Sequence, residues 1–160
     1  MRRPLSILAA SLACLLAIAA SGCGGAEEDT PVACLDGPGA YIAALGDAPG
    51  TVRLSGEVPI SDCLAANQEG GELATIGASM VSAATKLNAE ALADPGGAAS
   101  LRLGYLLGAA ESGAEQTGGI HAELVRRLRA AALYSPGARP LPPGFMRAYR
   151  EGFEAGSAGG

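Results

Sequence analysis

The chain has 160 residues, with 11 basic and 16 acidic side chains and a formal net charge of −5. This length suits one domain with a single hydrophobic core rather than two domains. The negative charge repels phosphate backbones, so we do not expect nucleic acid as a partner. The chain contains four tyrosines, two phenylalanines and no tryptophan, so each buried aromatic ring contributes a large share of the core.

The start of the chain has the pattern of an export signal. Two arginines open it, an uncharged and mostly apolar stretch covers residues 5–20, and Ser21 and Gly22 precede Cys23. A positive start, an apolar segment and small residues before the cleavage point define a secretory signal peptide. This arrangement resembles the signal peptide and lipobox of bacterial lipoproteins. The resemblance covers only this first segment.

The resemblance implies that cleavage leaves Cys23 as the first mature residue, with a lipid such as palmitate attached there. The lipid would hold the protein on the outer face of the cell membrane, or in the outer membrane of a two-membrane bacterium. Cleavage removes two of the 11 basic residues and none of the 16 acidic ones, so the net charge falls from −5 to −7. An anionic bilayer repels such a protein, so we expect the lipid, not a basic patch, to provide membrane attachment.

Two alternatives to lipidation stay open. The first is plain secretion after cleavage of the signal. The second is an uncleaved membrane anchor, although the apolar stretch of 16 residues is short for a spanning helix, which needs about 20.

The cysteines predict one disulfide. Cys14 leaves with the signal and Cys23 takes the lipid, so Cys34 and Cys63 remain. In an oxidising compartment such an even pair forms a disulfide. It would close a loop of about 30 residues and stabilise the fold by about 3–4 kcal/mol. The alternative is a thiol pair with a redox or metal role, but there is no C-x-x-C spacing, and the single histidine cannot complete a usual zinc site.

The segment after the signal divides into a tether and a cap. Residues 23–33 combine glycine, proline and acidic side chains, which predicts a flexible, solvated tether. Residues 34–63 form the disulfide-closed cap. Within the cap we predict a short helix over Pro38–Leu45, because a proline begins it and a glycine follows it, and an extended segment over Val52–Ser55.

Four longer helices follow the cap. Ser61 and Asp62 are predicted to cap a helix that begins near Cys63. Apolar residues then recur three and four positions apart, and proline or glycine interrupts each run. The predicted long helices cover residues 66–93, 98–116, 119–134 and 143–155. Short turns between long helices favour antiparallel neighbours.

The fold class is therefore all-α: a small antiparallel helical bundle with a disulfide-closed N-terminal cap. The single helical domain is predicted to cover residues 34–155, followed by a disordered tail at 156–160.

Two features of the predicted helices indicate how they pack. Gly104 and Gly108 share one helix face, and glycine within a helix costs about 1 kcal/mol relative to alanine. We therefore predict that another helix approaches this face closely. Phe145, Tyr149 and Phe153 stand four residues apart on the last helix. This stripe is predicted to anchor that helix to the bundle.

The sequence carries no recognisable catalytic or metal-binding motif. His121 is the only histidine, and neither Glu-x-x-His copy of a di-iron bundle is present. The serines lack the Gly-x-Ser-x-Gly context of a hydrolase nucleophile, and the glycine-rich segments lack the ending of a phosphate-binding loop. We therefore predict no catalytic residue, metal ligand or cofactor. His121 is expected to be a partly exposed residue that packs or hydrogen-bonds.

Arg126, Arg127 and Arg129 form the one basic cluster of the chain. On an acidic protein such a cluster can dock and orient an acidic partner. The alternative is a solvated helix face whose arginines are favoured by the helix dipole. Arg147 and Arg150 on the last helix could extend the cluster.

Taken together, these features predict a lipid-anchored cell-envelope protein that acts as a non-catalytic binding or accessory module, with another envelope protein as its partner. The alternative is a helical domain that binds a small molecule or peptide in an apolar pocket near Tyr105, Tyr134 and the aromatic helix. A hydrolase that depends on His121 is the least supported hypothesis.

Overall fold

The computed structural model of the chain describes residues 29–133 and 140–160. The predicted signal segment, Cys23 and Tyr134 lie outside these ranges. Elements labelled η are short 3-10 helices. In chain order the elements are η1 (Val32–Leu35), α1 (Pro38–Ala44), η2 (Leu45–Asp47), η3 (Ser61–Cys63), α2 (Gly70–Ala93), α3 (Ala98–Glu115), α4 (Ala122–Ala131) and α5 (Pro143–Gly159).

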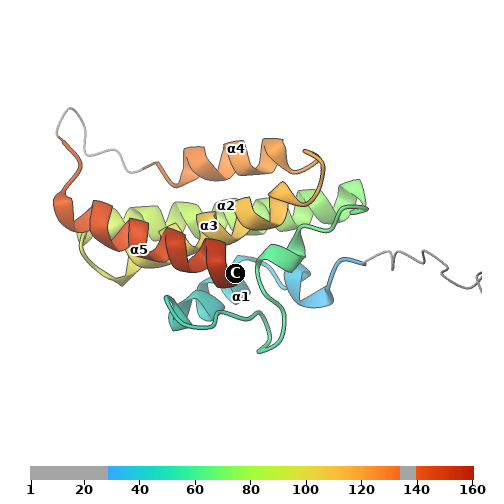
Figure 1. Cartoon of the computed structure of the whole chain (residues 1–160), viewed down its shortest axis with the longest axis horizontal. Coiled ribbons are helices and arrows are strands. Elements are labelled where there is room, and N and C mark those ends of the chain that lie inside the picture. Colours follow the sequence, from blue (N-terminus) through green and yellow to red (C-terminus); the bar gives the residue numbers. More distant parts are fainter. Residues whose placement is uncertain (1–28, 134–139) are drawn as a thin grey trace, which may run out of the picture.

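The described residues form an all-α bundle with a disulfide-closed N-terminal cap, as predicted (Figure 1). The long helices alternate in direction along the chain, so consecutive helices are antiparallel. α3 packs between α2 and α5. α4 lies against both α2 and α3, on the side of the bundle opposite the cap. The cap lies below the bundle in this view, with α1 under its middle and η1 nearer the end from which the chain enters.

The closest helix contact joins α3 and α5, which run parallel. Gly104 of α3 faces the backbone of Tyr149 of α5, and Gly108 faces that of Phe153. Residue numbers therefore rise in the same direction along both helices. A Cβ atom on either glycine would collide with a main-chain carbonyl oxygen. The predicted close approach at these two glycines is therefore confirmed.

The second half of this contact comes from α5. Gly152 and Gly156 face the backbone of Leu101 and Tyr105 in the same manner. Each helix thus supplies two glycines four residues apart, and the backbones meet with no side chain between them. This spacing places both glycines of a helix on the same face.

The cap contributes several fully buried side chains to the main core. Its extended segment lays two of them, Val52 and Leu54, onto the helices, and the Leu54 amide donates to the carbonyl of Val58 at 2.8 Å. Leu54 and Val58 form an isolated antiparallel β-bridge rather than a strand. The cap residues with at most 1% exposure are Cys34, Tyr41, Leu45, Val52, Leu54, Ile60 and Cys63.

α2 begins later than its periodicity predicted. The helix starts at Gly70 rather than at residue 66, and only the single 3-10 turn η3 forms near Cys63. The predicted cap is wrong, because neither η3 nor α2 has a side-chain cap, and the Ser61 hydroxyl donates to the neighbouring Asp62 carboxylate at 3.2 Å. Residues 64–69 instead form the connection between η3 and α2, which places the Gln68 side chain in the polar network described below.

Two other boundaries differ from prediction. α4 begins at Ala122 rather than at 119 because Gly118 and Gly119 adopt φ values of 62° and 94°, which a right-handed helix does not allow. The predicted disordered tail is helical, since α5 continues to Gly159. It stays ordered because Gly156 and Gly160 pack against α3.

The tether is also shorter than predicted. Its last residues already belong to the folded domain, because Val32–Leu35 forms η1 and the Cys34 amide donates to the carbonyl of Pro31 at 2.9 Å.

Among the described helices, none combines the length and the apolar character that crossing a membrane requires.

Candidate functional site

The predicted disulfide is confirmed. Cys34 and Cys63 are joined with an S–S distance of 2.00 Å and a Cα–Cα distance of 5.5 Å, and neither residue is exposed to solvent. The bond ties η1 to η3. The Tyr41 hydroxyl donates to the carbonyl of Cys34 at 2.9 Å, and burial, with a smaller effect from Asp36, raises the pKa of that hydroxyl. The cap is thus fixed at the point where the chain enters the domain.

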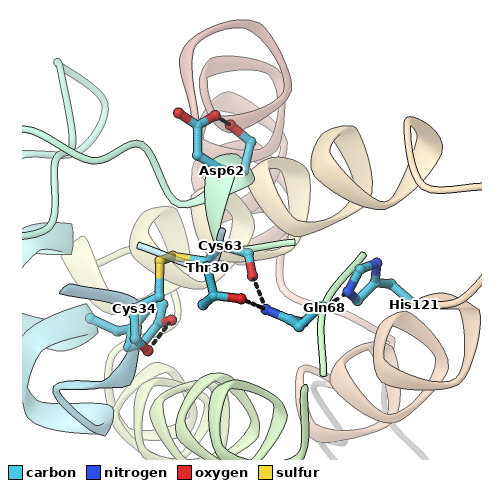
Figure 2. Close-up of a disulfide and its surroundings, with 8 residues drawn as sticks. Thr30, Cys34, Asp62, Cys63, Gln68 and His121 are labelled. Atoms are coloured by element: carbon cyan, nitrogen blue, oxygen red, sulfur yellow. Dashed lines mark hydrogen bonds between the residues drawn. A yellow bond between two sulfur atoms is a disulfide. The ribbon is translucent and has the colours of Figure 1, made fainter. Parts of the chain in front are cut away.

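A polar network beside the disulfide is centred on Gln68 (Figure 2). The Gln68 amide nitrogen donates to the Thr30 hydroxyl and to the Cys63 carbonyl, both at 3.0 Å. Its amide oxygen lies 3.0 Å from Nε2 of His121. One side chain therefore links the start of the domain, the disulfide and the beginning of α4.

The position of the Cys63 carbonyl determines which nitrogen of His121 carries a proton. A carbonyl can only accept, so the Gln68 nitrogen must face it, and the Gln68 oxygen must then accept from Nε2–H of His121. Nδ1 lies 2.9 Å from the Thr117 hydroxyl. In the neutral ring Nδ1 accepts from that hydroxyl.

The same network can also hold a protonated His121. The Thr117 hydroxyl lies 2.8 Å from the carbonyl of Ala114, so it can turn to that carbonyl while its oxygen accepts from Nδ1–H. Burial nevertheless lowers the pKa of His121 below its ordinary value, because a charged ring loses its hydration. The neutral form is the one that the folded state favours.

His121 is completely buried, so the expectation of a partly exposed residue is wrong, whereas the expected hydrogen bonding is present. Sequence reasoning could not identify Gln68, Thr117 and Thr30 as its partners or neighbours in the network. Thr117 and His121 are four residues apart, but Gly118 and Gly119 between them adopt positive φ values, so this contact is made across a turn and not along a helix face.

The order Thr117, His121, Gln68 resembles a nucleophile, a base and an orienting group. A substrate could not reach it, however, because Thr117 is 6% exposed and His121 is 0% exposed. Among the described residues, no group of three His, Cys, Asp or Glu side chains is placed to hold a metal ion. The geometry therefore supports a structural role for this network.

The arginines of α4 are exposed, but two of them are paired. Arg126 holds Glu123 through two hydrogen bonds of 2.8 and 2.7 Å, and Arg129 donates to Glu111 of α3 at 2.8 Å. The Glu123 pair is highly exposed, with side-chain exposures of 71% and 63%. Arg127 makes no salt bridge within the described ranges, so it is the cation of this cluster that is best placed to meet a partner.

The other two arginines lie on α5, beside acidic side chains. Arg147 and Arg150 of α5 line a shallow surface hollow together with Glu151 and Glu154. The hollow has no α4 residue in its lining.

The aromatic residues of α5 form a continuous row. The rings of Phe145 and Tyr149 stack with centroids 5.5 Å apart, and those of Tyr149 and Phe153 are 6.4 Å apart. Phe145 is only 4% exposed and packs with Ala91 of α2. Burial and the neighbouring Glu111 raise the pKa of Tyr149 to about 12. The row packs α5 onto the bundle, as predicted.

No protein-family model matches the chain, and comparisons with curated proteins and with solved structures likewise find no match.

Proposed function

We propose that this protein is a lipid-anchored, exported protein of the bacterial cell envelope that binds a partner without catalysing a reaction. The observation that carries the proposal is the buried disulfide between Cys34 and Cys63. Structural disulfides persist in oxidising compartments, which agrees with the export pattern ahead of Cys23. Lipid on Cys23 would attach the domain at its cap end.

The arrangement of polar groups favours binding over catalysis. The only histidine of the chain has both ring nitrogens engaged inside the protein, so a hydrolase that depends on His121 has no accessible base. The alternative ligand pocket near Tyr105 is also weakened, since this residue is 1% exposed and belongs to the main core. Tyr134, its other proposed wall, lies outside the described residues.

Mass spectrometry of the native protein tests the anchor. We expect a mature N-terminus at Cys23 that carries acyl chains, and a protein that leaves the membrane fraction only with detergent. The Cys23→Ala variant is the control and should be found outside the membrane fraction. A mature N-terminus at another residue, or an unmodified Cys23 thiol, would contradict the proposal.

Crosslinking and affinity capture from source membranes tests partner binding. We expect one envelope protein to be captured by the anchored form, and this capture to fall in Arg127→Glu. Arg150→Glu on α5 is the matched control, since it introduces the same charge reversal at another exposed site. Failure to capture any protein from well-solubilised membranes would contradict the accessory role.

A further inference from the structure

The folded domain begins at a well-defined point. The Thr30 hydroxyl accepts from Gln68 at 3.0 Å, and four residues later Cys34 is held by the buried disulfide. Figure 2 shows Thr30 and Gln68 beside this bond. A chain that leads from Cys23 into the domain therefore enters it at Thr30.

The connection to the proposed lipid is short. The inference made here rests on the proposed function, that is, on lipid attached to Cys23. From Cys23 to Thr30 the chain advances by seven residues, which span at most about 25 Å whatever path they take. α2 has 24 residues and, at 1.5 Å per residue, a length of about 36 Å. The connection is shorter than the bundle, so the end that carries Thr30 is held near the bilayer.

This end of the bundle exposes two large apolar side chains. Val32 is 77% exposed and follows Thr30 by two residues, and Ile120 is 45% exposed and precedes His121. Thr30 and His121 both bind the Gln68 side chain, which places their neighbours on the same part of the molecule. Figure 1 shows η1, the beginning of α2 and the connection from α3 to α4 at this end.

The charged residues around this end are acidic. Asp29, Glu69 and Glu115 are exposed there, so attraction to anionic headgroups does not bring this surface to a membrane. Contact must come from the two apolar side chains, which gain free energy when they leave water. Such a contact can be weak, because the anchor keeps the domain at a high effective concentration next to the lipid.

We infer that Val32 and Ile120 form a membrane-contacting surface that rests in the headgroup region of the bilayer that holds the anchor. The domain is then oriented, with η1 and the start of α4 toward the lipid and the start of α5 away from it. The lipid contacted is an uncharged bilayer surface, because the acidic residues around the contact disfavour an anionic one.

Tryptophan fluorescence tests this orientation, since the chain has no tryptophan of its own. The native, lipidated protein is reconstituted in phosphatidylcholine vesicles with brominated acyl chains, which quench nearby indole rings. Ile120→Trp is compared with Leu92→Trp, because both residues are 45% exposed and Leu92 lies at the far end of α2. We expect loss of emission for Ile120→Trp and for a second reporter, Val32→Trp, with emission retained for Leu92→Trp.

Two failures can be told apart in this experiment. A protein that floats with the vesicles but shows equal emission from Ile120→Trp, Val32→Trp and Leu92→Trp overturns the orientation and leaves the anchor intact. A protein that does not float, with an unmodified Cys23 by mass spectrometry, contradicts the proposed function and the orientation that rests on it.

Discussion

α5 and α4 are held in this domain in different ways. α5 meets α3 through four glycines, two from each helix, so that backbone packs directly on backbone. α4 is attached by a hydrophobic face, by His121 at its start and by one ion pair to α3. The first contact depends on the absence of side chains, and the second on an apolar helix face together with particular polar side chains. The two helices should therefore respond to different substitutions.

The largest effect is expected where backbone meets backbone. In Gly104→Ala the new methyl group would collide with the carbonyl oxygen of Tyr149, so the two helices must separate. We expect the free energy of unfolding to fall by about 3 kcal/mol, at the upper end of the usual cost of over-packing. Urea denaturation measures this change.

Gly71→Ala is the matched control for that substitution. Gly71 lies in α2 with no heavy atom within 4 Å of the position that a Cβ would take. Its replacement should stabilise the helix by up to about 1 kcal/mol. Equal destabilisation by both variants would contradict close packing at Gly104.

A smaller effect is expected at the polar network of α4. Gln68→Met removes the acceptor of His121 and the donor to Cys63, and leaves both of those groups without their partner. Unpaired buried polar groups cost about 1–3 kcal/mol each. Because Gln68 is only half-buried, we expect the low end of this range for the two groups, a loss of about 2 kcal/mol in the free energy of unfolding in the same assay. Gln116→Met is the control, since Gln116 is exposed and its side chain makes a long hydrogen bond, to the Ser112 carbonyl at 3.4 Å. A change no larger than that of the control would exclude a stabilising network.

The same network predicts a dependence of stability on pH. The pKa of His121 is lowered in the folded state, so the unfolded chain binds a proton more readily. Stability should be at its full value above the unfolded pKa of about 6.5 and fall as the pH decreases toward the folded pKa. His121→Gln should abolish this fall, because the chain has no other histidine. An unchanged pH profile in the variant would assign the dependence to other groups.

The smallest effects are expected at the exposed ion pairs of α4. Arg129→Ala should lower the melting temperature slightly, because it leaves the Glu111 carboxylate, whose side chain is 19% exposed, without its partner. Arg126→Ala should not change it measurably, since both members of that pair are highly exposed. A larger shift for Arg126→Ala than for Arg129→Ala would reverse this ranking.

The helices that follow simple periodicity could be predicted from the sequence. α3 and α5 begin where expected, and Gly104 with Gly108 correctly indicated a close approach, because helical glycines four apart share a face. The sequence did not reveal that the partner helix is α5 or that the two run parallel. The parallel pairing of α3 and α5 arises because α4, which runs antiparallel to both, lies between them in the chain and returns it to the end where α3 begins.

The polar network could not be predicted, for a physical reason. Thr30, Gln68 and His121 are far apart in the sequence and come together only when the disulfide-closed cap and α4 have packed. No periodicity connects such residues. The positive φ values of Gly118 and Gly119, which shorten α4, likewise reflect the turn that carries His121 inward.

Hydrogen exchange of the native protein and of Gln68→Met tests the difference between the two helices most directly. Amide exchange reports local opening of each helix. We expect faster exchange in α4 of the variant, with exchange in α3 and α5 unchanged. Equal acceleration in all three helices, or no acceleration in α4, would contradict the claim that Gln68 and His121 hold α4 to the bundle.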